Sequence, residues 1–372
     1  MHIAIDVRSL MEGRHSGVEE YTTQIIRAMT RMAPQHNYHL FYNNMRPVQL
    51  PNFGDGRVGV VARTFPNKLL NASQLLTGHP TWDALIPHTI DVVFAPNPRL
   101  LPLSPHIPMV VVMHDISFEL FPEFLTPRRR LWHQLMRPRQ LATNADHVIA
   151  VSEHTKQDLV DIYGLSPNDV SVVHSGVQAT PAARPQHIQG VRRRYNLPKK
   201  FILYLGTIEP RKNVVSIIRA WSAIADQVPQ DLVIAGERGW REGEVERAIA
   251  DSAFADRIHR VGFISESDKA ALYAAADVFV YPSFYEGFGF PPLEALLAGT
   301  PVITSFNSAL PEIVGEWSTL VDPYNTSQIA SVMREIVLRG QRVLPIVQQE
   351  IAKAYRWDVA AQKTIAILEK VV

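Results

Sequence analysis

Residues 206–213 combine a glycine, two adjacent cations and an asparagine between an apolar run and a segment with helical spacing. Gly206 permits a tight turn, and Asn213 is the predicted N-cap of the helix. Arg211 and Lys212 then lie at a helix N-terminus, where the helix dipole and free N–H groups already favour anions. This pattern predicts a pyrophosphate site. A solvated basic pair on a surface turn is the alternative.

Residues 281–295 place two carboxylates eight positions apart, with Glu286 in a predicted loop and Glu294 inside the following helix. Gly287 and Gly289 let backbone N–H groups approach a ligand, and the consecutive prolines suit the first helical turn. One carboxylate can reach a sugar while the other reaches ribose hydroxyls, because carboxylates accept paired hydroxyl hydrogen bonds. A helix-capping Glu and a buried structural Glu are the alternative interpretation.

Two further sites follow predicted strands in the first half of the chain. His114 and Asp115 come directly after the apolar run Met109–Met113, where they could form an acid/base or positioning pair, or cap the strand end. Residues 15–18, which include Gly17, could present N–H groups to a phosphate. A lone glycine is weak evidence for such a site, and a structural glycine loop is the alternative.

A basic segment without acidic residues lies between Phe124 and Ala145. Its sequence could form a basic helix that meets an anionic membrane surface, bind an acceptor phosphate, or present a solvated face. The side chains concerned are Arg128, Arg129, Arg130, Trp132, His133, Arg137 and Arg139.

Short apolar runs alternate with amphipathic segments along the whole chain, which predicts an α/β fold with parallel sheets. The predicted strands are Met109–Met113, His147–Val151, Phe201–Leu205, Asp231–Ala235, Asp277–Tyr281 and Pro301–Thr304. The predicted helices include Asn213–Gln227, Glu266–Ala276, Pro292–Ala298 and Trp357–Val372. Residues 178–200 contain three prolines and a glycine, which predicts a linker between two halves. Open α/β sheets bind ligands at the carboxyl ends of their strands, where the candidate residues occur.

The composition restricts the class of protein. The 372 residues are 46% hydrophobic and 20% charged, with a net charge of +1, so no strong global field favours nucleic acid. The chain lacks cysteine, which excludes disulfides and thiolate metal sites. Neither a signal peptide nor a run of roughly 18 apolar residues is present, so a cytoplasmic protein is expected.

Taken together, these segments resemble the retaining glycosyltransferases of family 4, over essentially the whole chain. The most specific match is the Glu-x7-Glu element from Glu286 to Glu294, preceded in the family's order by Gly206…Arg211-Lys212-Asn213. The resemblance implies the GT-B architecture, in which two Rossmann-like domains face each other across a deep crevice. The expected domains are 1–178, joined by the helix 357–372, and 179–356.

The resemblance also implies roles for individual residues. Arg211 and Lys212 would neutralise the donor diphosphate, Glu286 would bind the sugar, and Glu294 would bind the ribose. His114 would lie by the reacting face of the sugar, and Gly17 would lie under the diphosphate. The remaining donor-binding residues implied are Gly206, Phe263, Ile264, Phe288, Gly289 and Phe290. Ser16 departs from the glycine that the family often has there, which weakens the expected phosphate contact.

The expected reaction is transfer of a hexose from a nucleotide-sugar, with GDP-mannose as the expected donor, to a glycan or lipid-linked acceptor of surface polysaccharide. No metal or other cofactor is expected, because the chain contains no Asp-x-Asp tripeptide and cations with helix N-termini can stabilise the leaving group. Peripheral contact with an anionic membrane through Arg128–Arg139, at its inner face, is a further expectation. The alternatives are a sugar-phosphate or sucrose-type synthase of the same fold, and a non-catalytic nucleotide-sugar-binding protein.

Overall fold

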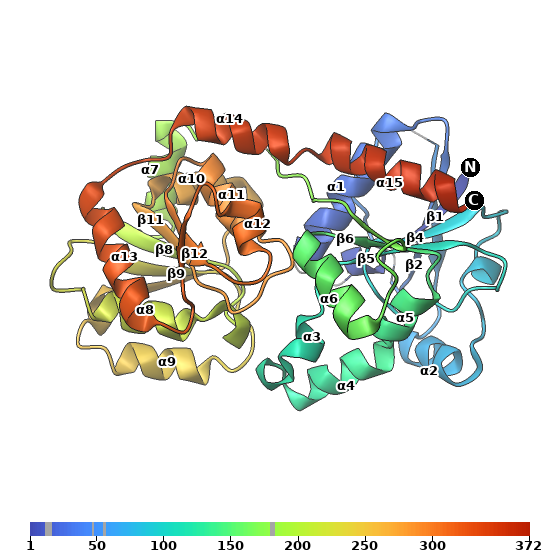
Figure 1. Ribbon diagram of the computed structural model, residues 1–372, viewed down its shortest axis with the longest axis horizontal. Helices are drawn as coiled ribbons and strands as arrows, with labels where there is room; N and C mark the ends of the chain where they lie inside the picture. The colour runs from blue at the N-terminus through green and yellow to red at the C-terminus, as the bar shows by residue number, and fades with distance from the viewer. Residues whose placement is uncertain (12–16, 47, 55–56, 179–182) are drawn as a thin grey trace. The chain divides into compact units, whose positions relative to one another are not determined.

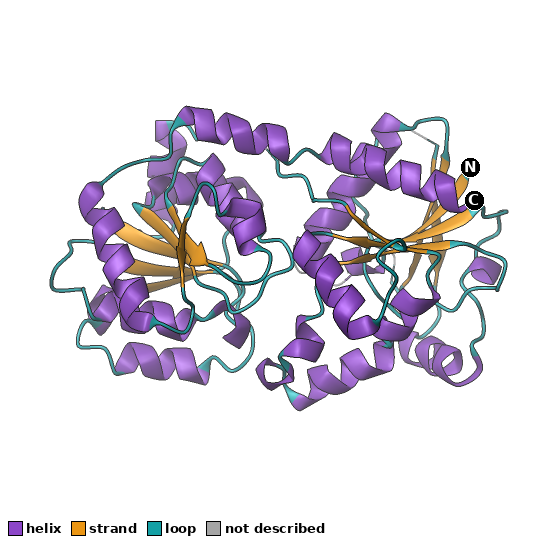
Figure 2. Ribbon diagram, in the orientation of Figure 1, coloured by secondary structure: helices purple, strands orange, loops and turns teal. Residues whose placement is uncertain are grey.

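The computed structural model divides the chain into two compact units, of which the first combines Met1–Gly176 with Tyr355–Val372 and the second is Val177–Ala354. Figure 1 traces the chain through both units, and Figure 2 shows helices packed around the strands of each. The structure describes residues 1–11, 17–46, 48–54, 57–178 and 183–372. The predicted α/β class is confirmed, because each unit contains a parallel sheet.

The first unit is built on a sheet with the strand order β3-β2-β1-β4-β5-β6-β7. Every residue of β4, β5 and β6 is buried, as expected for parallel strands that helices cover on both faces. The strands are β1 (His2–Asp6), β2 (Asn37–Asn43), β3 (Val58–Arg63), β4 (Val92–Ala95), β5 (Met109–Met113), β6 (His147–Ala150) and β7 (Val170–Val172).

The helices of this unit include α15, which follows the second unit in sequence and packs against α1. Ala361 and Leu368 of α15 are fully buried, and Glu369 lies 3.1 Å from Nε2 of His36. The helices are α1 (Gly17–Met32), α2 (Asn67–Thr77), α3 (Ser117–Leu120), α4 (Pro127–Met136), α5 (Pro138–Asn144), α6 (Glu153–Tyr163) and α15 (Trp357–Val371), with 3-10 turns η1 (Arg8–Met11), η2 (Asp83–Leu85) and η3 (Pro122–Phe124).

The second unit has a parallel sheet with the strand order β10-β9-β8-β11-β12-β13. Its strands are β8 (Phe201–Leu205), β9 (Asp231–Ala235), β10 (Ile258–Gly262), β11 (Val278–Tyr281), β12 (Val302–Ser305) and β13 (Thr319–Val321). Its helices are α7 (Pro185–Arg194), α8 (Val214–Ser222), α9 (Gly243–Ala250), α10 (Glu266–Ala275), α11 (Phe290–Leu297), α12 (Leu310–Val314), α13 (Thr326–Arg339) and α14 (Pro345–Ala354), with 3-10 turns η4 (Pro210–Lys212) and η5 (Ala255–Arg257).

The prediction of a linker throughout residues 178–200 is wrong, because ten of them form α7. Pro185 occupies the first helical position, where its missing N–H has no intrahelical partner to lose. Val191 is buried, and Arg192 Nη2 donates to the carbonyl of Ala275 at 2.8 Å. The predicted helix Asn213–Gln227 is also too long, since α8 ends at Ser222.

A buried carboxylate fastens α7 to α10. Asp268, which is 2% exposed, accepts hydrogen bonds from His187 at 3.1 Å, Arg194 at 2.5 Å and the Tyr195 hydroxyl at 2.9 Å. Burial would raise the pKa of Asp268, but the hydrogen bonds from His187, Ser265, Tyr195 and Arg194 outweigh it and lower the pKa to about 2. The carboxylate therefore stabilises the fold only where it is ionised.

We expect Asp268→Asn to lower the free energy of unfolding at pH 7 by about 2 kcal/mol, since it removes charged hydrogen bonds to a buried acceptor. The folded-state pKa is depressed, so the contribution is complete above the unfolded value of about 4 and lost as pH falls from there toward 2. Urea unfolding at pH 7 and pH 3 measures this loss. Glu266→Gln, in the exposed pair with Lys269 on the same helix, is the control. An equal deficit for Asp268→Asn at both pH values would contradict the expectation.

Candidate functional site

Glycines hold together the loops that follow β8, β9 and β10. Gly206 lies in a bend directly after β8, and Gly236, directly after β9, has a positive φ of +130°. A β-carbon on Gly236 would lie 1.9 Å from the carbonyl oxygen of Gly206, so only glycine fits. The N–H of Gly236 donates to the carbonyl of Gly262 at 2.7 Å. Directly after Gly262, Phe263 is 47% exposed whereas Ile264 is buried.

Asn213 stands at the N-cap position of α8, but its side chain does not cap the helix, so that prediction is wrong in its mechanism. Its backbone is left-handed, with φ +58°, a conformation that asparagine tolerates better than most residues. Its Nδ2 donates to the carbonyls of Pro282 at 3.1 Å and Pro323 at 2.7 Å. Asn213 thus joins the loops after β8, β11 and β13.

A buried ion pair connects the β8 and β11 loops. Lys212, at the end of η4, donates to Oε1 of Glu286 at 2.5 Å and to the hydroxyl of Tyr281 at 2.5 Å. Both charged side chains are about nine-tenths buried. The backbone of Glu286 is fixed as well, because its N–H donates to Ser308 Oγ at 3.0 Å and its carbonyl accepts from Ala309 at 3.2 Å.

Arg211 lies between two carboxylates rather than at the surface. Its Nη1 donates to Oε2 of Glu286 at 2.9 Å and to the carbonyl of Tyr285 at 2.8 Å. Its Nε and Nη2 both donate to Oε1 of Glu209, at 3.1 and 2.8 Å. Sequence reasoning assigned Glu209 no role. The available signal was an acidic residue two positions before Arg211 in the same turn.

Glu209, Arg211, Lys212 and Glu286 form what we call the charge cluster, with two cations, two carboxylates and a formal net charge of zero. Burial alone would raise the pKa of Glu286, but the charges of Arg211 and Lys212 outweigh it and lower the pKa to about 2. Burial and the Arg211 charge lower the pKa of Lys212, while both carboxylates oppose this change. Glu286 is therefore ionised at neutral pH.

The second carboxylate of the Glu-x7-Glu element lies on α11, as predicted. Glu294 is partly buried and accepts a hydrogen bond from the hydroxyl of Tyr273 at 2.9 Å. Gly289, at the N-cap position, has φ +100°, and a β-carbon there would lie 2.8 Å from Leu310. The ring of Phe288 is buried against that of Phe290, with centroids 5.1 Å apart. Phe288 can therefore offer a ligand its backbone more readily than its side chain.

The first turn of α11 contains Pro291 and Pro292, as predicted, although the helix begins at Phe290, two residues before the predicted start. Neither proline has an N–H, so this N-terminus offers an anion fewer donors than an ordinary helix. Among the helix N-termini expected to stabilise the leaving group, this one is therefore a weaker anion site than an ordinary helix start.

In the first unit, His114 and Asp115 do not form a dyad. His114 Nε2 contacts the carbonyl of Pro96 at 2.8 Å, so Nε2 carries the proton and Nδ1 is the acceptor. The Asp115 carboxylate instead accepts from the N–H and hydroxyl of Ser117, at the start of α3. Burial lowers the pKa of His114, which favours the neutral ring. Gly17 is the first residue of α1, whereas His15 and Ser16 lie outside the described residues.

The basic segment forms two helices rather than one, because Arg137 adopts a left-handed conformation between α4 and α5. The His133 ring stacks on Phe118, and Arg130 donates to the carbonyl of Pro122 at 2.7 Å. Arg128 remains exposed on α4. Three large apolar side chains are exposed on the same helix, Leu131 at 56%, Trp132 at 41% and Leu135 at 44%.

Two kinds of feature are absent from the described ranges. None of the helices there combines the length and apolar character needed to cross a membrane. In the same part of the chain, histidine and carboxylate side chains do not gather in groups of three or more that could hold a metal ion.

Two family models match the chain, one to each unit. Residues 15–180 match the model described as Glycosyltransferase Family 4, and residues 191–353 match that described as Glycosyl transferases group 1. The O-antigen chain mannosyltransferase B of Escherichia coli is 28% identical over 262 residues, which cover 69% of the chain and 68% of that protein. The serotype-specific mannosyltransferase WbdA of Escherichia coli is 26% identical over 368 residues, covering 90% of the chain but 44% of WbdA.

Solved structures share the fold at low sequence identity. Anabaena HepE, in complex with UDP and glucose, has a TM-score of 0.73 at 21% identity, with 100% of both chains covered. The sucrose-phosphate synthase of Thermosynechococcus elongatus has a TM-score of 0.74 at 20% identity, with 100% of this chain and 98% of that chain covered. At these identities the likeness concerns the fold.

We expect Asn213→Ala to destabilise the second unit by about 2–4 kcal/mol, because it removes two buried hydrogen bonds and puts alanine, which tolerates left-handed backbone less well than asparagine, at φ +58°. Asn213→Gly loses the same hydrogen bonds without the conformational cost, so its loss should be smaller. Urea unfolding of the three proteins measures both effects. If the alanine variant is as stable as the glycine variant, backbone conformation is not what selects Asn213.

Proposed function

Because the chain belongs to the group 1 and family 4 glycosyltransferases of GT-B fold, we propose that it transfers a hexose from a nucleotide-sugar with retention of anomeric configuration. The observation that carries this proposal is the charge cluster, in which Lys212 and Arg211 share the carboxylate of Glu286 at 2.5 and 2.9 Å. Glu294 follows on the next helix. This arrangement offers cations for a diphosphate and carboxylates for sugar and ribose hydroxyls.

In the proposed complex, Lys212 and Arg211 turn part of their hydrogen bonding toward the donor diphosphate. Oxygens of Glu286 released by this change accept hydrogen bonds from the sugar, while Glu294 accepts from the ribose. Phe263 and Ile264 border the base, and Gly206, Phe288, Gly289 and Phe290 line the donor with backbone groups. The proposed roles in the first unit are that Nδ1 of neutral His114 accepts a hydrogen bond from a sugar hydroxyl, and that Gly17 contributes its backbone N–H to the diphosphate.

The proposed reaction breaks the bond between the anomeric carbon and the phosphate oxygen and forms a bond from that carbon to the acceptor oxygen on the same face. The acceptor's proton passes to the departing phosphate. Lys212 and Arg211 stabilise the developing negative charge, so we propose that neither a metal nor another cofactor is required. In this same-face transfer Glu286 positions the sugar and does not become covalently attached.

We propose GDP-mannose as the donor and a glycan or lipid-linked acceptor of surface polysaccharide. Two relatives are named as mannosyltransferases, one of them of an O-antigen chain, and these names support mannose as the sugar and a polysaccharide acceptor. The sucrose-phosphate synthase fold neighbour supports a second candidate, transfer to a small sugar phosphate. A nucleotide-sugar-binding protein without turnover is the third candidate, which the intact charge cluster disfavours.

We also propose that α4 meets an anionic membrane surface. Arg128 and the exposed Leu131, Trp132 and Leu135 lie on this one short helix. Cations attract anionic head groups, while the apolar side chains enter the interface, so the two kinds of side chain act together.

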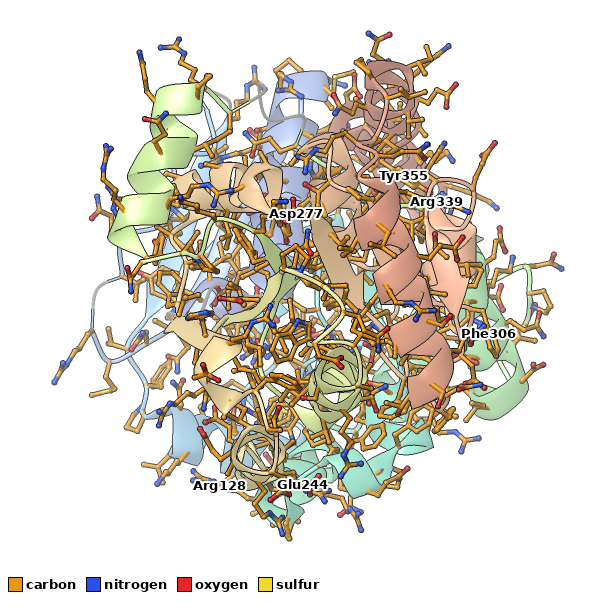
Figure 3. The ribbon with its side chains drawn as sticks, turned by 90° about the vertical axis from the view of Figure 1, so that its left-hand side faces the viewer. Arg128, Glu244, Asp277, Phe306, Arg339 and Tyr355 are labelled. Carbon is orange, nitrogen blue, oxygen red and sulfur yellow. The ribbon has the colours of Figure 1, made fainter. Side chains whose placement is uncertain are left out.

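Glu286→Ala and Lys212→Ala should each lower sugar transfer from GDP-mannose by about 100-fold or more, as expected when transition-state charge loses its partner. Product formation with polysaccharide fragments, sugar phosphates and water as acceptors measures the rate and separates the candidate reactions. EDTA should leave the wild-type rate unchanged. Glu335→Ala, in the exposed pair with Arg339 (Figure 3), is the control. Rates near wild type in both cluster variants would reject the proposal.

Vesicles test the proposed membrane contact. The protein should cosediment weakly with vesicles of phosphatidylglycerol and phosphatidylcholine, less as salt rises, and less after combined Arg128→Glu and Trp132→Ala substitution. Arg193→Glu, an equal charge change on exposed α7, is the matched control. Equal binding to pure phosphatidylcholine vesicles would count against an electrostatic contact.

A further inference from the structure

Glu209 is a buried acid whose only side-chain partner in the described part of the chain is Arg211. Its side chain is 7% exposed and receives both Nε and Nη2 of that guanidinium on a single oxygen. The residue directly precedes η4, and its side chain does not cap that turn. An ionised carboxylate at this depth is costly unless it is paired, so its contact with Arg211 has to be maintained.

Arg211 connects Glu209 to Glu286, because its guanidinium donates hydrogen bonds to both carboxylates. The guanidinium donates from one side to Glu209 and from the other to Glu286 and the carbonyl of Tyr285. A planar group held at both edges has little freedom to rotate. The Glu286 carboxylate is consequently fixed by Arg211 at Oε2 and by Lys212 at Oε1.

We propose that Glu209 is a positioning residue that sets both the orientation of Glu286 and the affinity of the site for nucleoside diphosphate. The inference rests on the proposed donor site. Without Glu209 the charge cluster would carry a net charge of +1 rather than zero, since two cations would face one carboxylate. A cluster with that charge holds a diphosphate product more tightly, which slows product release.

A structural role alone predicts a different pattern. A carboxylate that merely anchors a phosphate-binding arginine would, when removed, leave that arginine disordered and weaken diphosphate binding. The proposed role predicts stronger binding together with slower turnover, because the remaining net charge of +1 holds the diphosphate product in the site. The opposite signs of the two expectations make them separable.

Glu209→Gln keeps an acceptor oxygen for Arg211 and removes the charge. Calorimetric titration of the wild type with GDP and with UDP identifies the nucleotide that binds. The variant should bind that nucleotide about tenfold more tightly than the wild type, and the difference in affinity should shrink as salt rises. Hydrolysis of GDP-mannose, with water as acceptor, should show a lower kcat and a lower KM. Glu244→Gln removes an equal charge from an exposed pair on α9 (Figure 3) and should change neither quantity.

Glu209→Asp, which keeps the charge but shortens the side chain, should bind the nucleotide about as tightly as the wild type while kcat falls. If Glu209→Gln does not fold, unchanged kcat in Glu209→Asp overturns the inference. Weaker or unchanged diphosphate affinity in folded Glu209→Gln overturns it as well. A wild-type protein that binds neither GDP nor UDP would instead refute the proposed function, so the two failures are distinguishable.

Discussion

The ion pair between Lys212 and Glu286 constrains the whole carboxyl edge of the second sheet. Each charge is buried, and a buried charge without its partner costs several kcal/mol, roughly what a small domain has as net stability. The loops after β8 and β11 must therefore keep the Lys212 ammonium and the Glu286 carboxylate within hydrogen-bonding distance. Asn213 holds the β8 loop against the β11 loop through its hydrogen bond to the carbonyl of Pro282. The hydrogen bond from the N–H of Glu286 to Ser308 fixes the backbone of the β11 loop.

The charge cluster differs from an ordinary anion site because its formal net charge is zero. A bare pair of cations would simply attract a diphosphate, whereas here each cation already has a carboxylate partner. When a ligand binds, each cation exchanges a carboxylate partner for a ligand oxygen. The site therefore selects among ligands by how well their oxygens replace the displaced carboxylate contacts. Buried tyrosines complete the surroundings, since burial and the Glu286 charge raise the pKa of Tyr281 and keep its hydroxyl a neutral donor and acceptor.

Sequence reasoning succeeded where a property is local. The strand Phe201–Leu205 is recognisable residue for residue because a continuous apolar run needs no knowledge of its neighbours. It failed for α7, whose single buried residue leaves almost no periodic signal. It also missed Glu209, whose partner Arg211 lies in the same turn, because the sequence does not show that this pair is buried. It failed for the side chain of Asn213 because its partners lie on other loops that only the folded sheet brings near. The same applies to His114, whose partner is a backbone carbonyl rather than the adjacent acid.

The position of α15 has a consequence for biosynthesis. This helix completes the first unit, covering Tyr21 and other buried residues of α1, yet it follows the entire second unit in the sequence. During translation the second unit can therefore finish folding while the first still exposes part of its apolar surface. Domains usually fold in the order in which they are synthesised. Here the first unit begins to be synthesised before the second but can complete its fold only after it. Until α15 is made, that uncovered surface is a natural target for chaperones.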